Sequence, residues 1–287
     1  MRSFERICDL RTFLGRQRRA GLQIGLVPTL GALHEGHAAL VEAARRQNEM
    51  VVVSIFVNPT QFDSSTDFKT YPRDFQSDLA FCERHGVGVV FHPSEAEMYP
   101  EPPGTRISVP DLTRHLCGAK RPGHFEGVGI LVSKLFNIAQ PDRAYFGEKD
   151  AQQLAIIKRI VRDLDFPITL VGVPTVREAD GLAMSSRNAL LNPEQRRAAA
   201  MLNQHLQSAK QLLKSGEKDL KKVKIHLIER IQSESAAKID YVEIVDAETL
   251  QPAKSADRSL LIAAAVYFGG VRLIDNSICN FVKKDEP

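Results

Sequence analysis

The stretch 28–37 holds two histidines, His34 and His37, and two glycines, Gly31 and Gly36, between an apolar segment and a segment with helical spacing. This pattern predicts a strand, a turn and the first turn of a helix. A helix start offers unpaired backbone N–H groups and the positive end of the helix dipole, and both favour anions. Two imidazoles three residues apart face the same way and can hydrogen-bond phosphate oxygens. We therefore expect a nucleoside triphosphate site here.

Zinc is the alternative ligand for this pair, because histidine is the commonest imidazole ligand of metals. The pair lacks the four-residue separation of the His-Glu-x-x-His pattern, and the surrounding sequence offers no obvious third ligand. The preceding apolar strand and the two glycines favour phosphate over zinc. A surface or core position without a ligand is the third interpretation.

Two further segments, 147–150 and 184–188, place charged or hydroxyl side chains after expected strands. In a doubly wound sheet, ligands bind beyond the carboxyl ends of the strands. Cations and hydrogen-bond donors neutralise phosphate charge, and a carboxylate can hold Mg²⁺ through water. Taken singly, Lys149 could pair with a nearby acid and Ser185 could cap a helix. Together, these segments indicate phosphoryl or nucleotidyl transfer, and neither G-x-G-x-x-G nor a Walker A sequence is present.

Short apolar segments alternate with helical ones through much of the chain. Near-continuous β-branched residues suit strands buried on both faces of a parallel sheet. The rhythm of strand and helix predicts βαβ units and a doubly wound sheet. The expected strands lie near 24–27, 50–57, 87–91, 142–146 and 168–173.

Residues 93–124 interrupt this rhythm: prolines exclude a long helix in their first part, and 117–124 is expected to be a mobile basic loop. Beyond residue 185, helices precede adjacent strands, which indicates an α+β unit with an antiparallel sheet. We therefore expect an α/β protein. Residues 1–178 would form a Rossmann-like, doubly wound parallel sheet, and residues 179–287 a smaller C-terminal α+β domain that covers the active site. The C-terminal elements are expected near 193–214, 218–232, 239–245, 260–268 and 271–274.

Composition is that of an ordinary globular protein, with 43% hydrophobic and 25% charged residues and a net charge of only +3. Four cysteines lie far apart without a C-x-x-C pair, which is typical of reduced thiols in the cytosol. The N-terminus has no signal-peptide core, and the longest apolar run, 260–270, is about half of the ~20 residues that a membrane span needs. We expect a cytoplasmic protein without a membrane partner.

A run of lysines between 214 and 224 raises the alternative of nucleic-acid binding. Acidic residues, Glu217 and Asp219, interrupt the run, and no aromatic residues alternate with it as a stacking platform would need. A solvated helix face explains the lysines more simply, so we expect no nucleic-acid partner.

Several segments resemble the pantothenate synthetase (pantoate–β-alanine ligase) family of the HxGH nucleotidyltransferase-like superfamily. They span most of residues 25–192 in the family's order and spacing, whereas the C-terminal third contributes little. One such match could be chance, but a full set in order could hardly be. The matching segments are 28–37, 56–62, 71–73, 121–125, 145–153 and 181–188.

The resemblance implies an ATP-dependent ligase that activates pantoate as pantoyl adenylate, releases pyrophosphate, and then joins the acyl group to β-alanine with release of AMP. It also implies Mg²⁺ and a homodimer. Two alternatives stay open at this point. One is another adenylyltransferase of the superfamily with a different small acceptor, and the other is a non-catalytic nucleotide- or RNA-binding protein.

Carried over residue by residue, the resemblance implies that Gln61 and Gln153 bind pantoate, that Gln61 also lies near β-alanine, and that Asp150 and Asp78 lie near Mg²⁺. The family commonly has Met where Leu30 stands, a change that keeps an apolar side chain of similar volume. The implied catalytic residues are His34, His37 (the proton donor), Lys149 and Arg187. The implied ATP contacts are Leu30, Gly31, Ala32, Leu33, His34, Glu35, Gly36, His37, Gly147, Glu148, Lys149, Asp150, Val176 (against the adenine), Met184, Ser185, Ser186 and Arg187.

Overall fold

The computed structural model describes residues 1–281 of the chain, and at Ser65 the backbone only. The chain forms two compact units, each with its own sheet. The first unit comprises residues 1–109, 121–148 and 153–174, and the second comprises 110–120, 149–152 and the described residues from 175 to 281. The second unit therefore includes two short segments that precede the domain boundary expected between residues 178 and 179.

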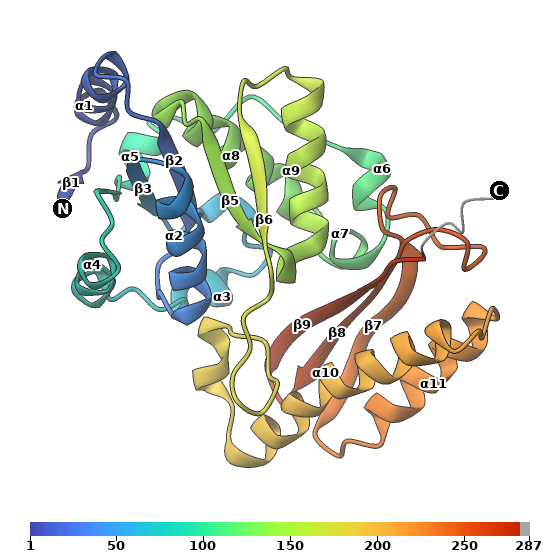
Figure 1. Ribbon diagram of the computed structural model, residues 1–287. Coiled ribbons are helices and arrows are strands. Elements are labelled where there is room, and N and C mark those ends of the chain that lie inside the picture. Colours follow the sequence, from blue (N-terminus) through green and yellow to red (C-terminus); the bar gives the residue numbers. More distant parts are fainter. Residues whose placement is uncertain (282–287) are drawn as a thin grey trace. The chain divides into compact units, whose positions relative to one another are not determined.

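Parallel strands form the sheet of the first unit (Figure 1). In spatial order they are β1 (Arg2–Phe4), β4 (Val89–Phe91), β3 (Met50–Ile55), β2 (Ile24–Thr29), β5 (Arg143–Gly147) and β6 (Thr169–Val173). The order runs from β2 to β4 in one direction and from β5 to β6 in the other. The sheet is therefore doubly wound, as predicted, and its topological switch point lies between β2 and β5. The edge strand β1 is missing from the predicted strands because three residues are too few to show a period.

Helices cover both faces of this sheet, because successive side chains of a buried strand point to opposite faces. Leu26 of β2 belongs to one apolar cluster together with Leu14 and Leu135, whereas the next residue, Val27, belongs to another together with Val41. The helices wholly or mostly in this unit are α1 (Ile7–Arg19), α2 (Glu35–Gln47), α3 (Ser65–Thr70), α4 (Phe75–Arg84), α5 (Glu95–Met98), α8 (His124–Ala139) and α9 (Ala151–Asp163), with the 3-10 turn η1 (Pro59–Gln61).

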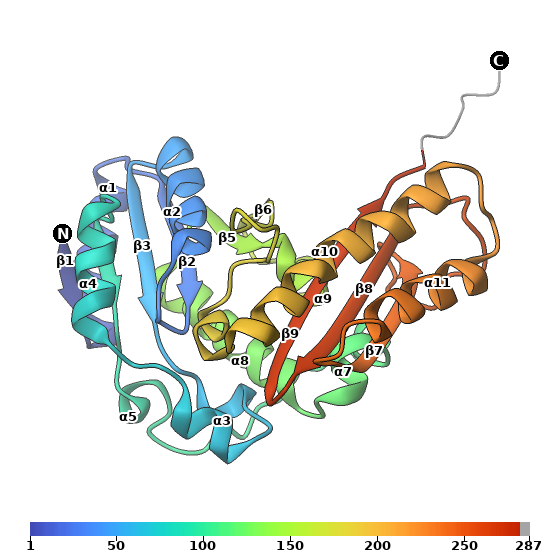
Figure 2. The same cartoon turned by 90° about the horizontal axis from the view of Figure 1, so that it is seen from below.

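An antiparallel sheet with two long helices along it forms the core of the second unit (Figure 2). The start of the first of these helices follows its predicted cap: the Asn192 side chain accepts from the Gln195 N–H, the Gln195 side chain accepts from the Asn192 N–H, and Pro193 opens the helix. The elements of this unit are α6 (Pro110–Thr113), α7 (Leu116–Lys120), η2 (Glu148–Asp150, from its second residue), η3 (Ser186–Leu190), α10 (Pro193–Lys214), α11 (Leu220–Gln232), β7 (Ala237–Asp246), β8 (Leu260–Phe268) and β9 (Val271–Cys279).

The segment expected to be a mobile loop at 117–124 is different in the structure, because Leu116–Lys120 is the helix α7. Gln152 holds the chain just before it: its Nε2 donates to the carbonyl oxygens of Leu112 and His115, both at 2.8 Å. A five-residue helix that follows several prolines is too short to show a helical period, so the pattern could not predict it.

Within the described part of the chain, none of the helices combines the length and the apolar character that crossing a membrane requires.

Candidate active site

The turn between β2 and α2 carries the two histidines, and a carboxylate from α4 holds it. Gly31 (φ 85°) and Ala32 (φ 51°) both have left-handed backbone conformations. The Asp78 carboxylate accepts hydrogen bonds from the N–H groups of Ala32 (3.0 Å) and Leu33 (2.8 Å). A Cβ at Gly31 would lie 2.8 Å from Asp78 Oδ2, so the approach of this carboxylate requires glycine there.

The imidazoles of His34 and His37 lie together at the start of α2, with ring centroids 4.2 Å apart. The Gly36 N–H donates to Nδ1 of His34 (3.1 Å), and the His34 N–H donates to Nδ1 of His37 (3.2 Å). A nitrogen that accepts from an N–H carries no proton, so each neutral ring is protonated at Nε2. The two half-buried rings therefore present Nε2–H groups as hydrogen-bond donors.

The backbone N–H groups around this helix start differ from the expectation that they are unpaired. Those of Ala32 and Leu33 bind Asp78, and those of His34 and Gly36 bind imidazole nitrogens. The cause is a capping box at the start of α2, in which the imidazoles of His34 and His37 accept hydrogen bonds from backbone N–H groups of the first turn. An anion at this place would therefore be bound mainly by the imidazole Nε2–H groups.

The second polar turn begins beside the first. Strand β5 pairs with β2, with Gly25 opposite Arg143, so Thr29 and Gly147 end neighbouring strands at the same edge of the sheet. Glu148 follows directly. Loops at the carboxyl ends of strands beside a switch point are where doubly wound sheets bind ligands.

The side-chain amide of Gln61, which ends η1, is held in one orientation. Asn58 Nδ2 donates to its Oε1 (3.1 Å) and also to the carbonyl oxygen of Gly127 in α8 (3.0 Å). Because Oε1 accepts from Asn58, the Nε2 amino group is the part of Gln61 available to donate to a ligand. The other expected pantoate residue, Gln153, is half-buried in the first turn of α9.

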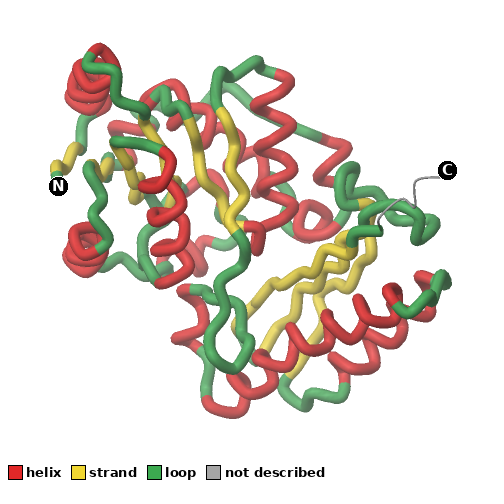
Figure 3. The backbone as a smooth tube through the Cα atoms, viewed as in Figure 1, coloured by secondary structure: helices red, strands yellow, loops and turns green. Residues whose placement is uncertain are grey.

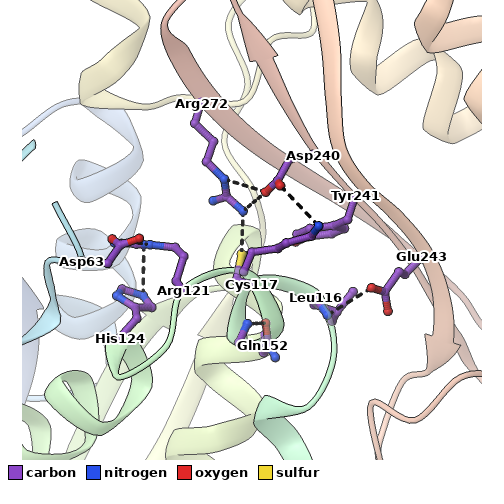
Figure 4. A network of polar contacts seen from close by, with 12 residues as sticks. Asp63, Leu116, Cys117, Arg121, His124, Gln152, Asp240, Tyr241, Glu243 and Arg272 are labelled. Atoms are coloured by element: carbon purple, nitrogen blue, oxygen red, sulfur yellow. Dashed lines mark hydrogen bonds and ion pairs between the residues drawn. The ribbon is translucent and has the colours of Figure 1, made fainter.

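The backbone of Gln61 is held by His124 at the start of α8, which belongs to a chain of polar side chains with Arg121 and Asp63. Figure 4 shows these three side chains together. Arg121 donates to Nε2 of His124 (3.3 Å), so the ring carries its proton on Nδ1, which donates to the Gln61 carbonyl oxygen (2.6 Å). Arg121 also pairs with Asp63 at 2.7 Å. Burial raises the pKa of Asp63, but the hydrogen bond and the charge of Arg121 outweigh it and leave this pKa below its usual value.

In the second unit, two neighbouring residues of β9 anchor segments that carry expected ATP contacts. Asn276 Nδ2 donates to the backbone carbonyl oxygen of Lys149 (2.9 Å), which fixes the turn from which the lysine side chain extends. Asp275 accepts two hydrogen bonds from Arg177, at 2.7 and 3.0 Å. The Lys149 side chain is half-buried, and Asp150 is exposed.

The residues expected around the adenine and triphosphate in 176–187 come together on one hairpin-like segment, which lies within the long stretch between β6 and α10 (Figure 3). The Met184 N–H donates to the Val176 carbonyl oxygen (3.0 Å). Ser185 then caps η3, its Oγ accepting from the Arg187 N–H (3.3 Å). This capping role is the ordinary explanation for Ser185, and it also fixes the direction in which Ser186 and Arg187 leave the turn.

A second polar network in Figure 4 holds α7 against β7 and β9. Arg272 pairs with Asp240 at 2.8 Å and donates to Cys117 Sγ at 3.6 Å, and the same sulfur lies 3.3 Å from the Tyr241 hydroxyl. Burial and the neighbouring Cys117 raise the pKa of Tyr241. Cys117 and Tyr241 are buried, and Arg272 and Asp240 are half-buried. Because these groups are bonded to one another, their role is to fix the segment 110–120 within its unit.

The sequence interpretation gives no role to several residues that support this site. Their partners are far away in the sequence, which is why spacing alone does not reveal them. The one available signal was their presence in or near the resembling segments, or, for the β9 pair, a polar pair inside an apolar strand. The supporting residues are Asn58, Asp63, Arg121, His124, Arg177, Asp275 and Asn276.

A doubly wound sheet with a paired-histidine turn at its switch point defines the class of α/β proteins whose ligands usually bind at the carboxyl ends of the strands. The family model described as pantoate-beta-alanine ligase matches residues 2–278. The chain therefore belongs to the pantoate-beta-alanine ligase family, as the resembling segments predict, and the protein is a ligase of pantothenate biosynthesis.

Known proteins of this family are similar to this chain in both sequence and fold. The pantothenate synthetase of Acetivibrio thermocellus is 52% identical over 97% of this chain and 99% of its own. The crystal structure of pantothenate synthetase from Thermus thermophilus has a TM-score of 0.91, with 45% identity over 96% of this chain and 99% of that one. The pantoate-beta-alanine ligase from Francisella tularensis, complexed with beta-gamma ATP and beta-alanine, has a TM-score of 0.78, with 33% identity and 97% coverage of both chains.

Proposed function

We propose that this protein condenses pantoate and β-alanine to pantothenate with ATP, through pantoyl adenylate, and releases pyrophosphate and AMP. The family supports pantoate and β-alanine as substrates, and the ligands of the Francisella tularensis structure support ATP and β-alanine. The observation that carries the proposal within this molecule is the histidine pair, whose two Nε2–H groups form a donor pair suited to phosphate oxygens.

The chemistry has two steps. A carboxylate oxygen of pantoate attacks the α-phosphorus of ATP, and the bond to pyrophosphate breaks. The neutral amine of β-alanine then attacks the acyl carbon, and AMP leaves with the electrons of the acyl–oxygen bond while the nitrogen loses a proton. Adenylation replaces oxide, a poor leaving group, with AMP. The protein therefore needs chiefly to position the reactants and to stabilise negative charge.

Cationic side chains and hydrogen-bond donors can stabilise the negative charge of the phosphates. His34 and His37 would donate to the phosphate oxygens, and Lys149 would stabilise the charge that develops at the α-phosphate. Ser186 and Arg187 would bind the triphosphate, and Val176 would lie against the adenine. These assignments rest on the family motifs. The anchoring of Lys149 by Asn276 and the hairpin that carries Ser185–Arg187 support them, because both keep the donors pre-oriented.

The remaining ATP contacts that the family motifs imply would come from the two turns after β2 and β5, from the start of α2 and from the residue before the cap of η3. They would be Leu30, Gly31, Ala32, Leu33, Glu35, Gly36, Gly147, Glu148, Asp150 and Met184.

Gln61 and Gln153 would bind the acid substrates. Pantoate and β-alanine both present carboxylate oxygens, which accept hydrogen bonds, and the fixed amide of Gln61 offers the donor side that such oxygens need. Gln61 would serve both substrates in turn, since the amine must approach the acyl carbon that the same residue helps to hold.

Mg²⁺ would accompany ATP. No group of three histidine, cysteine, aspartate or glutamate side chains that could hold a metal ion is present in residues 1–281. Mg²⁺ bound to a nucleotide needs no such cage, because phosphates and waters supply most of its ligands. The exposed carboxylate of Asp150 fits a role through a bridging water. The Mg²⁺ would neutralise phosphate charge. The second expected Mg²⁺ residue, Asp78, already accepts two backbone hydrogen bonds.

We further propose that the protein works in the cytoplasm as a homodimer, as the family resemblance implies. The cysteines in the described chain are all free, which suits a reducing compartment.

The test is an AMP-release assay in which pantoate, β-alanine and ATP are omitted in turn. AMP should appear only with all three. Pyrophosphate exchange into ATP should require pantoate but not β-alanine, because the adenylate forms first. Exchange that is independent of pantoate, or equally strong with unrelated small acids, would refute the assignment.

Lys149→Ala should lower the rate of pantoate-dependent exchange by about a hundredfold to a thousandfold, which is typical for losing one group that stabilises developing charge. The fold should survive, because the side chain is only half-buried and it is the backbone of Lys149 that Asn276 binds. Lys158→Ala, at an exposed position of α9, is the matched control and should exchange like the wild type. Wild-type pyrophosphate release from Lys149→Ala would count against the proposed role.

A further inference from the structure

Asp78 has an unusual position for a carboxylate. It is 4% exposed, on α4, and both of its oxygens face the turn that precedes the histidines. The two N–H groups that it accepts from, those of Ala32 and Leu33, belong to successive residues that lie 46 and 45 positions away in the sequence. Successive N–H groups in a turn of this kind form a concavity that binds anions. In this protein the anion in the concavity is a carboxylate of the chain itself.

A buried carboxylate needs hydrogen-bond donors, and the turn at Ala32 and Leu33 supplies two of them to Asp78. A buried charge that fixes a local backbone geometry in this way is typical of functional sites.

The turn that Asp78 holds is directly connected to the two histidines. Leu33 precedes His34, the N-cap of α2, and the Nδ1 atoms of both imidazoles depend on backbone N–H groups of this same segment. If the turn at Ala32 and Leu33 shifted, the direction of both Nε2–H groups would change with it.

We propose that Asp78 is a positioning residue for the histidine turn: its carboxylate occupies the backbone anion site at Ala32 and Leu33 and thereby sets the orientation of His34 and His37. The inference rests on the proposed function, in which these imidazoles bind the phosphates of ATP. It differs from a role as a Mg²⁺ ligand, because the carboxylate acts through the turn and does not contact the metal.

Asp78→Asn tests this. The amide keeps the size of the side chain but replaces one acceptor oxygen with an NH₂ donor, which would face a backbone N–H. We expect the kcat of pantoate-dependent ATP–pyrophosphate exchange to fall about tenfold to a hundredfold, the loss that a misplacement of about 1 Å produces. The KM for pantoate should stay unchanged. The unfolding temperature should stay close to that of the wild type, because the removal of a buried charge offsets the loss of one hydrogen bond. Glu83→Gln, exposed on the same helix, is the matched control and should behave like the wild type.

The outcomes separate the possibilities. Wild-type exchange in Asp78→Asn would overturn the inference. Recovery of exchange at high Mg²⁺ concentration would also overturn it, since it would identify a metal ligand. A fall in exchange that is matched by an equal fall in the fraction of folded protein would indicate a purely structural role and would overturn it too. A wild-type protein without any pantoate-dependent exchange would refute the proposed function instead.

Amide hydrogen exchange of the wild-type protein, followed by NMR, is a second test that needs no variant. The Ala32 and Leu33 N–H groups should be protected without ATP and should stay equally protected when ATP is added, because Asp78 already binds them. Exchange at the rate of an unstructured peptide without ATP, followed by protection on adding ATP, would show that these groups await the phosphate and would overturn the inference.

Discussion

Gln152 and Gln153 are neighbours at the start of α9, but successive residues of a helix point in directions about 100° apart. The Gln152 amide is buried and bonded to the carbonyl oxygens of Leu112 and His115, so it belongs to the support of the segment before α7. Gln153 is half-buried and is the one that the family resemblance assigns to pantoate. Two identical side chains in sequence thus have different expected roles.

Alanine substitutions at this pair should have opposite signatures. Gln153→Ala should raise the KM for pantoate much more than the KM for ATP, with little change in stability. Gln152→Ala should lower the free energy of unfolding by about 1–3 kcal/mol, because one buried and one half-buried carbonyl group lose their donor. Steady-state kinetics and urea unfolding of both variants measure this. Equal increases of the two KM values in Gln153→Ala would mean that pantoate binds elsewhere.

At this scale, spacing alone predicts that His34 and His37 lie together, because residues three apart in a helix are neighbours. Their dependence on Asp78 is beyond sequence reasoning, since the contact joins residues 45 and 46 positions apart. The same holds for Asn276 and Lys149, which are 127 positions apart. Local periodicity carries no information about such pairs, and only the folded chain brings them into contact.

At the level of elements, α8 approaches η1 very closely beside Gln61. A Cβ at Gly127 would lie 2.2 Å from the Thr60 carbonyl oxygen, so α8 reaches η1 only because this helical position is glycine. Gly15 in α1 is a contrasting case: its nearest neighbour would be the flexible end of Arg19, at 3.7 Å. The contact at Gly127 also places the carbonyl that accepts from Asn58, and through it the amide of Gln61.

Alanine substitutions at Gly127 and Gly15 should therefore have opposite effects on the stability of the protein. Gly127→Ala should destabilise the protein by about 1–3 kcal/mol or more through overpacking, and should raise the KM for the substrate that Gln61 binds. Gly15→Ala should stabilise it by about 0.5–1 kcal/mol, the usual gain from replacing glycine in a helix interior. Denaturant unfolding and kinetics test both. A stable and fully active Gly127→Ala protein would show that α8 can move away from η1 without effect on Gln61.

The sheets and the long helices are the elements that the sequence predicts well. Continuous β-branched segments identify the buried parallel strands, and the Asn192–Gln195 cap identifies the start of α10. The short helices between β3 and α8 are not predicted, because four to six residues span little more than one turn and show no period. Such segments take their conformation from side chains elsewhere, as α7 does from Gln152, Tyr241 and Arg272.

For the molecule as a whole, acidic and basic residues nearly balance, with 35 Asp and Glu against 38 Lys and Arg. Its response to acid should therefore depend on particular pairs more than on general repulsion. The clearest pair in the second unit is Glu178 with Arg196, at 2.6 Å, and Asn188 Nδ2 donates to the same carboxylate at 2.8 Å. The hydrogen bond from Arg196 is the main reason why the pKa of Glu178 is lowered, and partial burial opposes it.

Proton binding by Glu178 is linked to folding, and this linkage gives the direction in which stability changes with pH. Because the folded pKa of Glu178 lies below its usual value of 4.5, the unfolded chain takes up a proton there first as the pH falls. The stability from this pair is complete above that value and is lost as the pH falls through the folded pKa. Near pH 7, Glu178→Gln should therefore lower the free energy of unfolding by roughly 1 kcal/mol, as expected for a partly exposed ion pair.

The difference between wild type and Glu178→Gln should then shrink as the pH is lowered to about 3, because acid removes from the wild type what the substitution has already removed. Thermal unfolding of both proteins across this range measures the difference directly. Other carboxylates titrate in the same window, but they are common to both proteins and cancel. Glu229→Gln, at an exposed position of α11, controls for the loss of one negative charge. A difference that stays constant or grows toward low pH would mean that Arg196 holds Glu178 by packing and not by its charge.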